Sequence, residues 1–269
     1  MTPSPNVEIT RDGAVLCVTF DRPDKKNAIN RAMYMAATEA LRQADGDRSI
    51  GAVVFAGSGG VFTAGNDIAD FLEASAGPGE LPAFTFIKAL AACETPLVAA
   101  IEGIAIGIGA TMMLHCDLVY VAPGTVFRLP FVDLGLVPEA ASSLLLPRRA
   151  GMAKAAEFLL LGEAFGAGEA VRLGLANAVV PACELRGFAI ERAGQLAAKP
   201  RAAIAATRRL MRGDRQEILA GLRYRSWIAR AGCPRSVNPL SKSTHKGSPV
   251  QLIKRTKVAI RRGPCCGQR

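Results

Sequence analysis

The feature that most constrains the fold is a regular alternation of short apolar runs with longer helix-like segments. Apolar runs of strand length occupy residues 14–21, 51–57, 96–103 and 117–123. The segment 27–45 follows the first run, and its apolar residues share one helical stripe: Ile29, Met33, Ala36, Ala37, Ala40 and Leu41. Strands that alternate with helices predict crossover connections and a layered α/β core.

The second half of the chain continues this pattern. Between the last two apolar runs, residues 104–115 read as a Gly-rich turn that leads into a buried helix. The remaining segments are a helix, a short helix with a strand, and two further helices, at 149–162, 169–181, 184–199 and 201–213. Half of the 269 residues are apolar, which is enough for a large core. We find no internal repeat and no linker before Leu222.

The positive charge of the chain is concentrated at its C-terminal end. The chain has 33 Lys and Arg residues against 23 Asp and Glu, a net charge of +10. Residues 222–269 hold 12 of the basic residues and none of the acidic ones, so the first 221 residues carry a net charge of −2. A solvated tail is the favoured interpretation, and an arm that binds polyanions is the alternative.

Several classes of function lack their sequence signatures. The seven Cys form no C-x-x-C motif and no His cluster accompanies them, so we expect no metal site and reduced thiols in the cytoplasm. We expect no membrane span and no secretory leader. His115 lies in an apolar segment, where a satisfied core residue is the favoured interpretation, and His245 lies in the basic tail. A Ser-His-Asp triad is therefore unsupported.

Two Gly-bearing segments are candidates for binding a negatively charged oxygen. Residues 57–71 turn at Gly65 and enter a helix near Asn66, which exposes backbone N–H groups. Residues 102–114 lack the spacing of a dinucleotide fingerprint, but Gly107 and Gly109 allow a second donor to face the first segment. Each segment also has a purely structural interpretation, as a capped turn and as close helix packing.

Glu139 is the single charged residue in the stretch LGLVPEAASS, residues 134–143. Most Pro-Glu steps are solvated turns. The apolar neighbours Leu136, Val137 and Ala140 would raise the pKa of this carboxyl by desolvation, as a base that works near neutral pH requires.

Taken together, these segments resemble the crotonase superfamily, the enoyl-CoA hydratase/isomerase family. The matching segments keep their order over residues 10–215, at 21–30, 61–71, 94–123, 127–151 and 169–180. The resemblance implies a crotonase-like spiral of β-β-α units in residues 1–200, and the start of a C-terminal helical region in residues 201–221. Residues 222–269 depart from the family pattern. We interpret them as an atypical tail, disordered or produced by a frameshift.

The resemblance also implies the parts of the site. The amides of Asn66 and Ile108 would hold the enolate oxygen of a CoA thioester. The CoA-binding positions would be Asn27, Ala28, Thr63, Ala64 and Asp67. CoA is then part of the substrate, and no separate cofactor is expected. The family resemblance further implies a homotrimer, or a dimer of trimers.

The acids and bases decide which reaction the resemblance implies. Hydratases of the family use two Glu residues, and those positions here hold Thr111 and Phe131. The sequence around Glu139 is instead similar to peroxisomal-type Δ3,Δ2-enoyl-CoA isomerases, which place one catalytic Glu there. Asp133 is the competing carboxylate and is interpreted as structural. Other acyl-CoA enzymes of the family, an inactive acyl-CoA binder and, last, a nucleic-acid-binding module remain alternatives.

Overall fold

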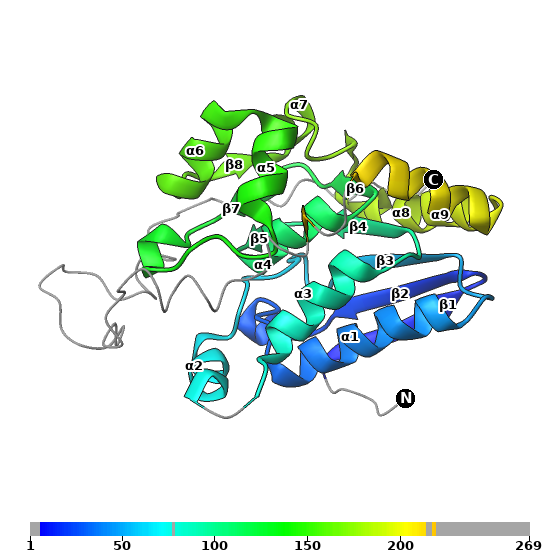
Figure 1. The fold of residues 1–269 in the computed structure, drawn as a ribbon, viewed down its shortest axis with the longest axis horizontal. Coiled ribbons are helices and arrows are strands. Elements are labelled where there is room, and N and C mark those ends of the chain that lie inside the picture. Colours follow the sequence, from blue (N-terminus) through cyan, green and yellow to red (C-terminus); the bar gives the residue numbers. More distant parts are fainter. Residues whose placement is uncertain (1–5, 77–78, 214–216, 219–269) are drawn as a thin grey trace, which may run out of the picture.

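The computed structural model describes residues 6–76, 79–213 and 217–218, and they form two sheets surrounded by helices (Figure 1). In the larger sheet the strand order is β1-β2-β3-β4-β6-β9. The strands are Val7–Asp12, Val15–Phe20, Ala52–Gly57, Leu97–Ile101, Leu118–Val121 and Ala178–Val179. The first two pair antiparallel, and each later pairing is parallel, as crossover connections require.

The smaller sheet has the order β5-β7-β8. Its strands are Ile104–Ile106, Val126–Arg128 and Phe165–Gly166. β5 and β7 follow β4 and β6 directly in the chain, so each β-β step passes from one sheet to the other. This arrangement places the segment 101–108 at the junction of the two sheets.

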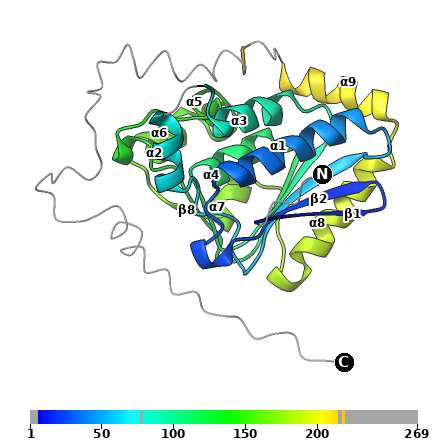
Figure 2. The ribbon, with the colours of Figure 1, turned by 90° about the horizontal axis from the view of Figure 1, so that it is seen from below.

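Helices cover both faces of the larger sheet. In chain order, the α-helices among the described residues are Arg31–Gly46 (α1), Ile68–Ala76 (α2), Pro82–Ala92 (α3), Ile108–Thr111 (α4), Ser142–Ala150 (α5), Met152–Leu160 (α6), Ala167–Arg172 (α7), Ala182–Ala197 (α8) and Arg201–Arg212 (α9). Three 3-10 turns are Pro23–Lys25 (η1), Met112–His115 (η2) and Val132–Leu134 (η3). Figure 2 shows α1 and α3 on one side of the sheet and α8 on the other.

The strand sequences explain why the sheet is covered on both sides. Alternate residues of a strand point to opposite faces, and both sets are apolar here. Phe20, Val53 and Phe55 belong to the cluster that includes α1 and α3. Cys17 and Val54 belong to the cluster that includes α8, where many of the residues are small. A layered α/β core is therefore what the sequence predicts and what the structure has.

Two of the expected helix boundaries are wrong, and two elements were missed. The helix predicted over 27–45 begins only at Arg31, because Asn30 caps it through a 3.0 Å bond from the Met33 amide. Ile29 lies outside that helix. The helix predicted over 149–162 is divided at Gly151, whose φ of 80° interrupts the helix. The segments 7–12 and 82–92, a strand and a helix, were not predicted.

Asn27 fastens together the loops that follow β2 and β3. It is fully buried and adopts a left-handed conformation with φ of 55°. Its Oδ1 accepts a 2.7 Å bond from the Arg22 amide, and its Nδ2 donates to the carbonyls of Ser58 and Val61 at 3.0 and 2.6 Å. Asn tolerates this conformation better than most residues, so backbone and side chain both favour it here.

The helix α9 is attached to the core through arginines. Arg201 donates to the Ile50 carbonyl at 2.8 Å, and Arg208 pairs with Asp117 at 2.9 Å. Arg212 also pairs with Asp117, at 3.0 Å, and donates to the His115 carbonyl at 2.6 Å. These bonds satisfy carbonyls that the strands and turns leave unpaired.

The proposed boundary at Leu222 and the atypical tail 222–269 lie outside the described residues and stay predictions. Within the described ranges, no helix has the length and apolar character needed to cross a membrane.

We predict that Asn27→Ala lowers the free energy of unfolding by about 3 kcal/mol, because it removes three buried hydrogen bonds and leaves their partners unpaired. Chemical denaturation measures this. Asp24→Ala, an exposed change in the same loop, is the control and should stay within about 0.5 kcal/mol of wild type. Equal stability of the two variants would show that Asn27 does not fasten the loops.

Candidate active site

The amide of Asn66 is free to donate because of how its neighbours pair. Ile29 donates to the Gly65 carbonyl at 2.8 Å and accepts from the Asp67 amide at 2.9 Å. In this parallel bridge Ile29 bonds to Gly65 and Asp67, the residues on either side of Asn66. The N–H of Asn66 therefore points away from Ile29. Among the described residues, nothing accepts a bond from the Asn66 amide.

A second free amide lies at the start of α4. Gly107 precedes the helix with φ of 55° and ψ of −116°, a conformation that favours glycine. Ile108 is the first helical residue, so its N–H has no partner within the helix. No described residue accepts from it, whereas the Gly107 amide donates to the Arg128 carbonyl at 2.9 Å.

Two glycines allow the loops that carry these amides to touch. Thr63 donates to the Ile104 carbonyl and accepts from the Ile106 amide, at 3.0 and 3.1 Å. A Cβ at Gly65 would lie 2.8 Å from the Ile106 carbonyl oxygen, and one at Gly109 would lie 2.5 Å from Thr63 Cγ2. The missing side chains therefore bring the loop of Asn66 against the loop of Ile108.

Glu139 lies in the loop between η3 and α5 with its carboxyl group turned inward. Its Oε1 is buried and has no hydrogen-bond partner among the described residues. Burial raises the pKa of Glu139 from 4.5 to about 7. The next two residues, Ala140 and Ala141, have φ of 53° and 54°. Consecutive non-glycine residues in this region are strained, and such strain is concentrated at functional sites.

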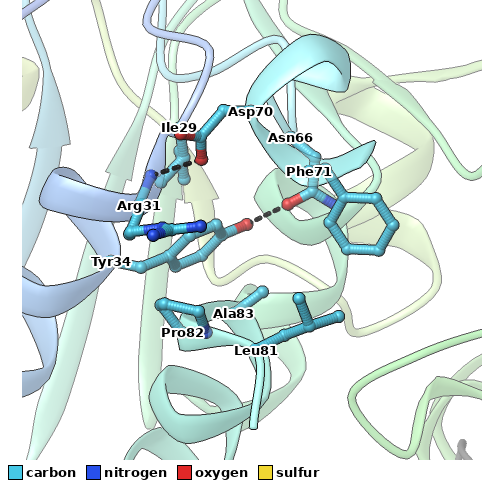
Figure 3. Close-up of a pocket in the computed structure, with 9 residues that line it drawn as sticks. All are labelled: Ile29, Arg31, Tyr34, Asn66, Asp70, Phe71, Leu81, Pro82 and Ala83. Carbon is cyan, nitrogen blue, oxygen red and sulfur yellow. Dashed lines mark hydrogen bonds between the residues drawn. The ribbon is translucent and has the colours of Figure 1, made fainter. Parts of the chain in front are cut away.

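Tyr34, a residue of α1 that the sequence did not single out, joins these groups. Its buried hydroxyl donates to Asn66 Oδ1, as Figure 3 shows. Burial raises the pKa of Tyr34 well above 10, and the carboxylates of Glu139 and Asp70 add to this effect. Tyr34 therefore stays protonated.

A narrow hollow opens beside Tyr34 and Asn66. It has room for about one water molecule. Its walls come from the start of α1, from α2 and from the start of α3: Ile29, Arg31, Tyr34, Asn66, Asp70, Phe71, Leu81, Pro82 and Ala83 (Figure 3). Five of these residues are apolar, and the polar side chains of the lining are those of Arg31, Tyr34, Asn66 and Asp70.

The residues predicted to bind CoA lie on two adjoining loops, at 27–28 and 63–67. The Ala64 amide donates to the Lys26 carbonyl at 2.9 Å, and Thr63 Oγ1 donates to the Asn27 carbonyl at 2.6 Å. The Ala28 carbonyl accepts from Arg22 at 3.1 Å. No described residue donates to the Ala64 carbonyl, which leaves that acceptor for a ligand. The role of these positions in CoA binding stays a prediction.

Asp67 has a structural role within the protein. It pairs with Arg22 at 2.7 Å, and its Oδ1 accepts from the amide of Ala69 at 3.2 Å near the start of α2. Burial alone would raise the pKa of Asp67, but Arg22 and the backbone donors outweigh it and lower the pKa. Asp67 thus caps α2, one of the two alternatives that the sequence left open.

The remaining candidates for acid-base chemistry are otherwise engaged. Thr111 and Phe131, at the positions where hydratases hold Glu, are both buried. Asp133 pairs with Arg128 at 3.0 Å, consistent with a structural role. His115 is buried and its Nε2 lies 2.8 Å from the Ala140 carbonyl oxygen, so it is the satisfied core residue that the sequence favours.

Comparison with known proteins identifies the family. A profile of the enoyl-CoA hydratase/isomerase family matches residues 10–225. The chain belongs to this family. It is 38% identical over 184 residues to enoyl-CoA delta isomerase 2 of Rattus norvegicus, a match that covers 66% of this chain. The match spans 47% of the rat protein, about half its length.

Other relatives have different names. A probable enoyl-CoA hydratase of Rhodobacter capsulatus is 37% identical over 198 residues, covering 71% of this chain and 75% of that protein. The crystal structure of an enoyl-CoA hydratase/isomerase from Pseudoalteromonas atlantica T6c superposes with a TM-score of 0.81 at 36% identity, covering 97% of this chain and all of that one. The crotonase fold is thereby confirmed. The names of the relatives do not agree on one reaction.

The described residues contain no group of three or more His, Cys, Asp and Glu side chains that could hold a metal ion. The four cysteines among them are all free thiols: Cys17, Cys93, Cys116 and Cys183.

We predict that Gly109→Ala lowers the free energy of unfolding by about 2 kcal/mol, because the new methyl group overlaps Thr63 Cγ2. Thr63→Ser keeps the hydroxyl and removes that methyl group, so the double variant should recover at least half of the loss. A double-mutant cycle by chemical denaturation measures the coupling. Additive losses would mean that the loops do not meet at Gly109.

Proposed function

We propose that the protein is a Δ3,Δ2-enoyl-CoA isomerase with Glu139 as its single acid-base group. The observation that carries this proposal is the buried, unpaired Oε1 of Glu139, together with Thr111 and Phe131 at the hydratase positions. A hydratase of the two-carboxylate type needs a second Glu to handle the water molecule. An isomerase needs only one carboxylate, because the same group removes and returns one proton.

The reaction follows from the arrangement of these groups. Glu139 removes a proton from C2 of a 3-enoyl-CoA, and the C–H electrons form a dienolate whose charge rests on the thioester oxygen. The amides of Asn66 and Ile108 stabilise that oxygen, since each is an unpaired donor held by its loop. Glu139 then delivers the proton to C4, and the double bond moves from C3–C4 to C2–C3.

The environment of Glu139 suits a proton carrier. A carboxyl group with a pKa of about 7 is partly deprotonated near neutral pH and returns its proton readily. Tyr34 keeps the Asn66 side chain in place without competing for the proton, because its own pKa is raised. We further propose that acyl-CoA is the substrate and that CoA is needed in no other role. A homotrimer and a cytoplasmic location are additional expectations from the family.

We predict that Glu139→Gln lowers kcat for conversion of a 3-enoyl-CoA to its conjugated isomer by about 10²–10⁴-fold. The Gln side chain fills the same space but carries no transferable proton. Ultraviolet absorbance of the conjugated product measures the rate. Asp133→Asn is the matched control, a carboxylate-to-amide change in the preceding turn η3, and should keep kcat within about threefold.

The outcomes separate the alternatives. Equal loss in both variants would place the proton transfer elsewhere. If the wild-type protein binds CoA esters without moving the double bond, an assay of 2-enoyl-CoA hydration decides between a hydratase and an inactive binder.

We predict that kcat/KM rises with pH through about pH 7, because Glu139 acts in its deprotonated form. Stability should change in the opposite direction. The folded state holds this proton more tightly than the unfolded chain between pH 4.5 and 7, so stability falls as pH rises through that range. The loss is about 2 kcal/mol after allowance for partial exposure of the residue.

Glu139→Gln removes this pH dependence, so its stability relative to wild type should increase by the same amount between pH 4.5 and 8. Urea denaturation at the two pH values measures it. A constant difference would show that Glu139 titrates in its ordinary range.

A further inference from the structure

His115 makes a contact that the chemistry just described does not use. It is the last residue of η2, and its Nε2 lies 2.8 Å from the carbonyl oxygen of Ala140, 25 residues further along the chain. That carbonyl belongs to the residue directly after Glu139. A buried His therefore contacts the turn from which the proposed base projects.

The direction of this hydrogen bond is determined by the charge state of the ring. The pKa of His115 is lowered to about 4, chiefly by burial and to a smaller extent by the guanidinium groups of Arg212 from α9 and Arg149 from α5. The bond to Ala140 only partly offsets these effects. The ring is neutral at pH 7, and because a carbonyl oxygen can only accept, Nε2 carries the proton and donates.

The turn that receives this bond needs outside support. Ala140 and Ala141 both adopt left-handed conformations, each at a cost of about 1–2 kcal/mol. Across these two residues, the Glu139 carbonyl accepts from the amide and hydroxyl of Ser142, at 2.9 and 2.6 Å. Together with the His115 bond, these contacts keep the two residues in a conformation that alanine alone would leave.

The same helical stretch also carries one of the enolate-binding amides. Ile108 begins α4, and η2 continues from it without a break to His115. Arg212 and Arg149 donate to the carbonyls of His115 and Leu114, at 2.6 and 2.8 Å, and so fix the end of this stretch. One rigid element thus connects the Ile108 amide to the turn after Glu139.

We propose that His115 is a positioning residue, whose Nε2–H donates to the Ala140 carbonyl and thereby sets the place of the Glu139 carboxylate relative to the Ile108 amide. The proposal rests on the isomerase function proposed above. It assigns His115 no contact with substrate and no proton transfer.

The test compares two amide side chains at this position. His115→Gln places an N–H donor close to the site of Nε2 and should keep kcat within about threefold of wild type. His115→Asn is equally polar but too short to reach the Ala140 carbonyl, so kcat should fall by about 10–100-fold while KM changes less than threefold. Cys116→Ala, a buried neighbour that makes no contact with the turn, is the control.

A second measurement does not depend on turnover. The pKa of Glu139, followed by carboxyl 13C NMR in the free enzyme, should stay near the wild-type value in His115→Gln. It should move toward 4.5 in His115→Asn, because a relaxed turn lets water reach the carboxylate.

The outcomes distinguish this proposal from the function on which it rests. Folded Gln and Asn variants with equal kcat and equal Glu139 pKa would overturn the positioning role, provided that wild type turns over the 3-enoyl-CoA. A second outcome is that wild type shows no turnover, while the Glu139 pKa still differs between His115→Gln and His115→Asn. This outcome would support the positioning role and reject the isomerase function. If His115→Asn does not fold, Ala140→Gly is added to it. The positioning role predicts that this second change restores folding, because glycine relieves the strained conformation. A double variant that still does not fold overturns the positioning role.

Discussion

The contact between two backbone segments, 63–66 and 104–109, is the constraint on which the site depends. Thr63 bonds to β5 on both sides, and there is space only for a hydrogen atom at Gly65 and Gly109. Because peptide groups pack this closely, the amides of Asn66 and Ile108 lie on adjoining loops and neither turns inward to a partner. The donors are therefore in place before any ligand arrives, which is the condition under which hydrogen bonds stabilise a developing charge most effectively.

Glu139, the proposed base, follows a different principle, because its buried oxygen lies where no described group donates a hydrogen bond to it. Glu139 has a buried oxygen without a partner and is followed by two strained residues. Each of these features costs stability, and the surroundings compensate through Ser142 and His115. A carboxylate with good hydrogen-bond partners would be stabilised in its charged form, so its pKa would be low and it would be a weak base. The two amides thus rely on rigid preorganisation, whereas the carboxylate relies on poor solvation.

The sequence predicts the layered core from local signals, and the family resemblance indicates the candidate site residues, whose roles stay predictions. Apolar runs identify the long strands, and the glycines identify the two loops. Strands of two or three residues, such as β7 and β8, are too short to show a period. Tyr34 and His115 could not be found this way, because their roles come from contacts with residues 32 and 25 positions away. Nor does an Ala-Ala pair indicate a left-handed turn, a conformation that only the tertiary structure imposes.

The arginines of α9 have a consequence for how the chain acquires its fold. Arg201 reaches back 151 residues to the Ile50 carbonyl, and Arg208 reaches back 91 residues to Asp117. Contacts over such separations form late, because the cost of closing a long loop precedes the gain from the contact. During synthesis the sheet can assemble from its N-terminal end, but the Ile50 carbonyl and the Asp117 carboxylate lack their arginine partners until α9 has left the ribosome. The final packing of the core, including the end of η2 behind the site, therefore waits for residues beyond 200.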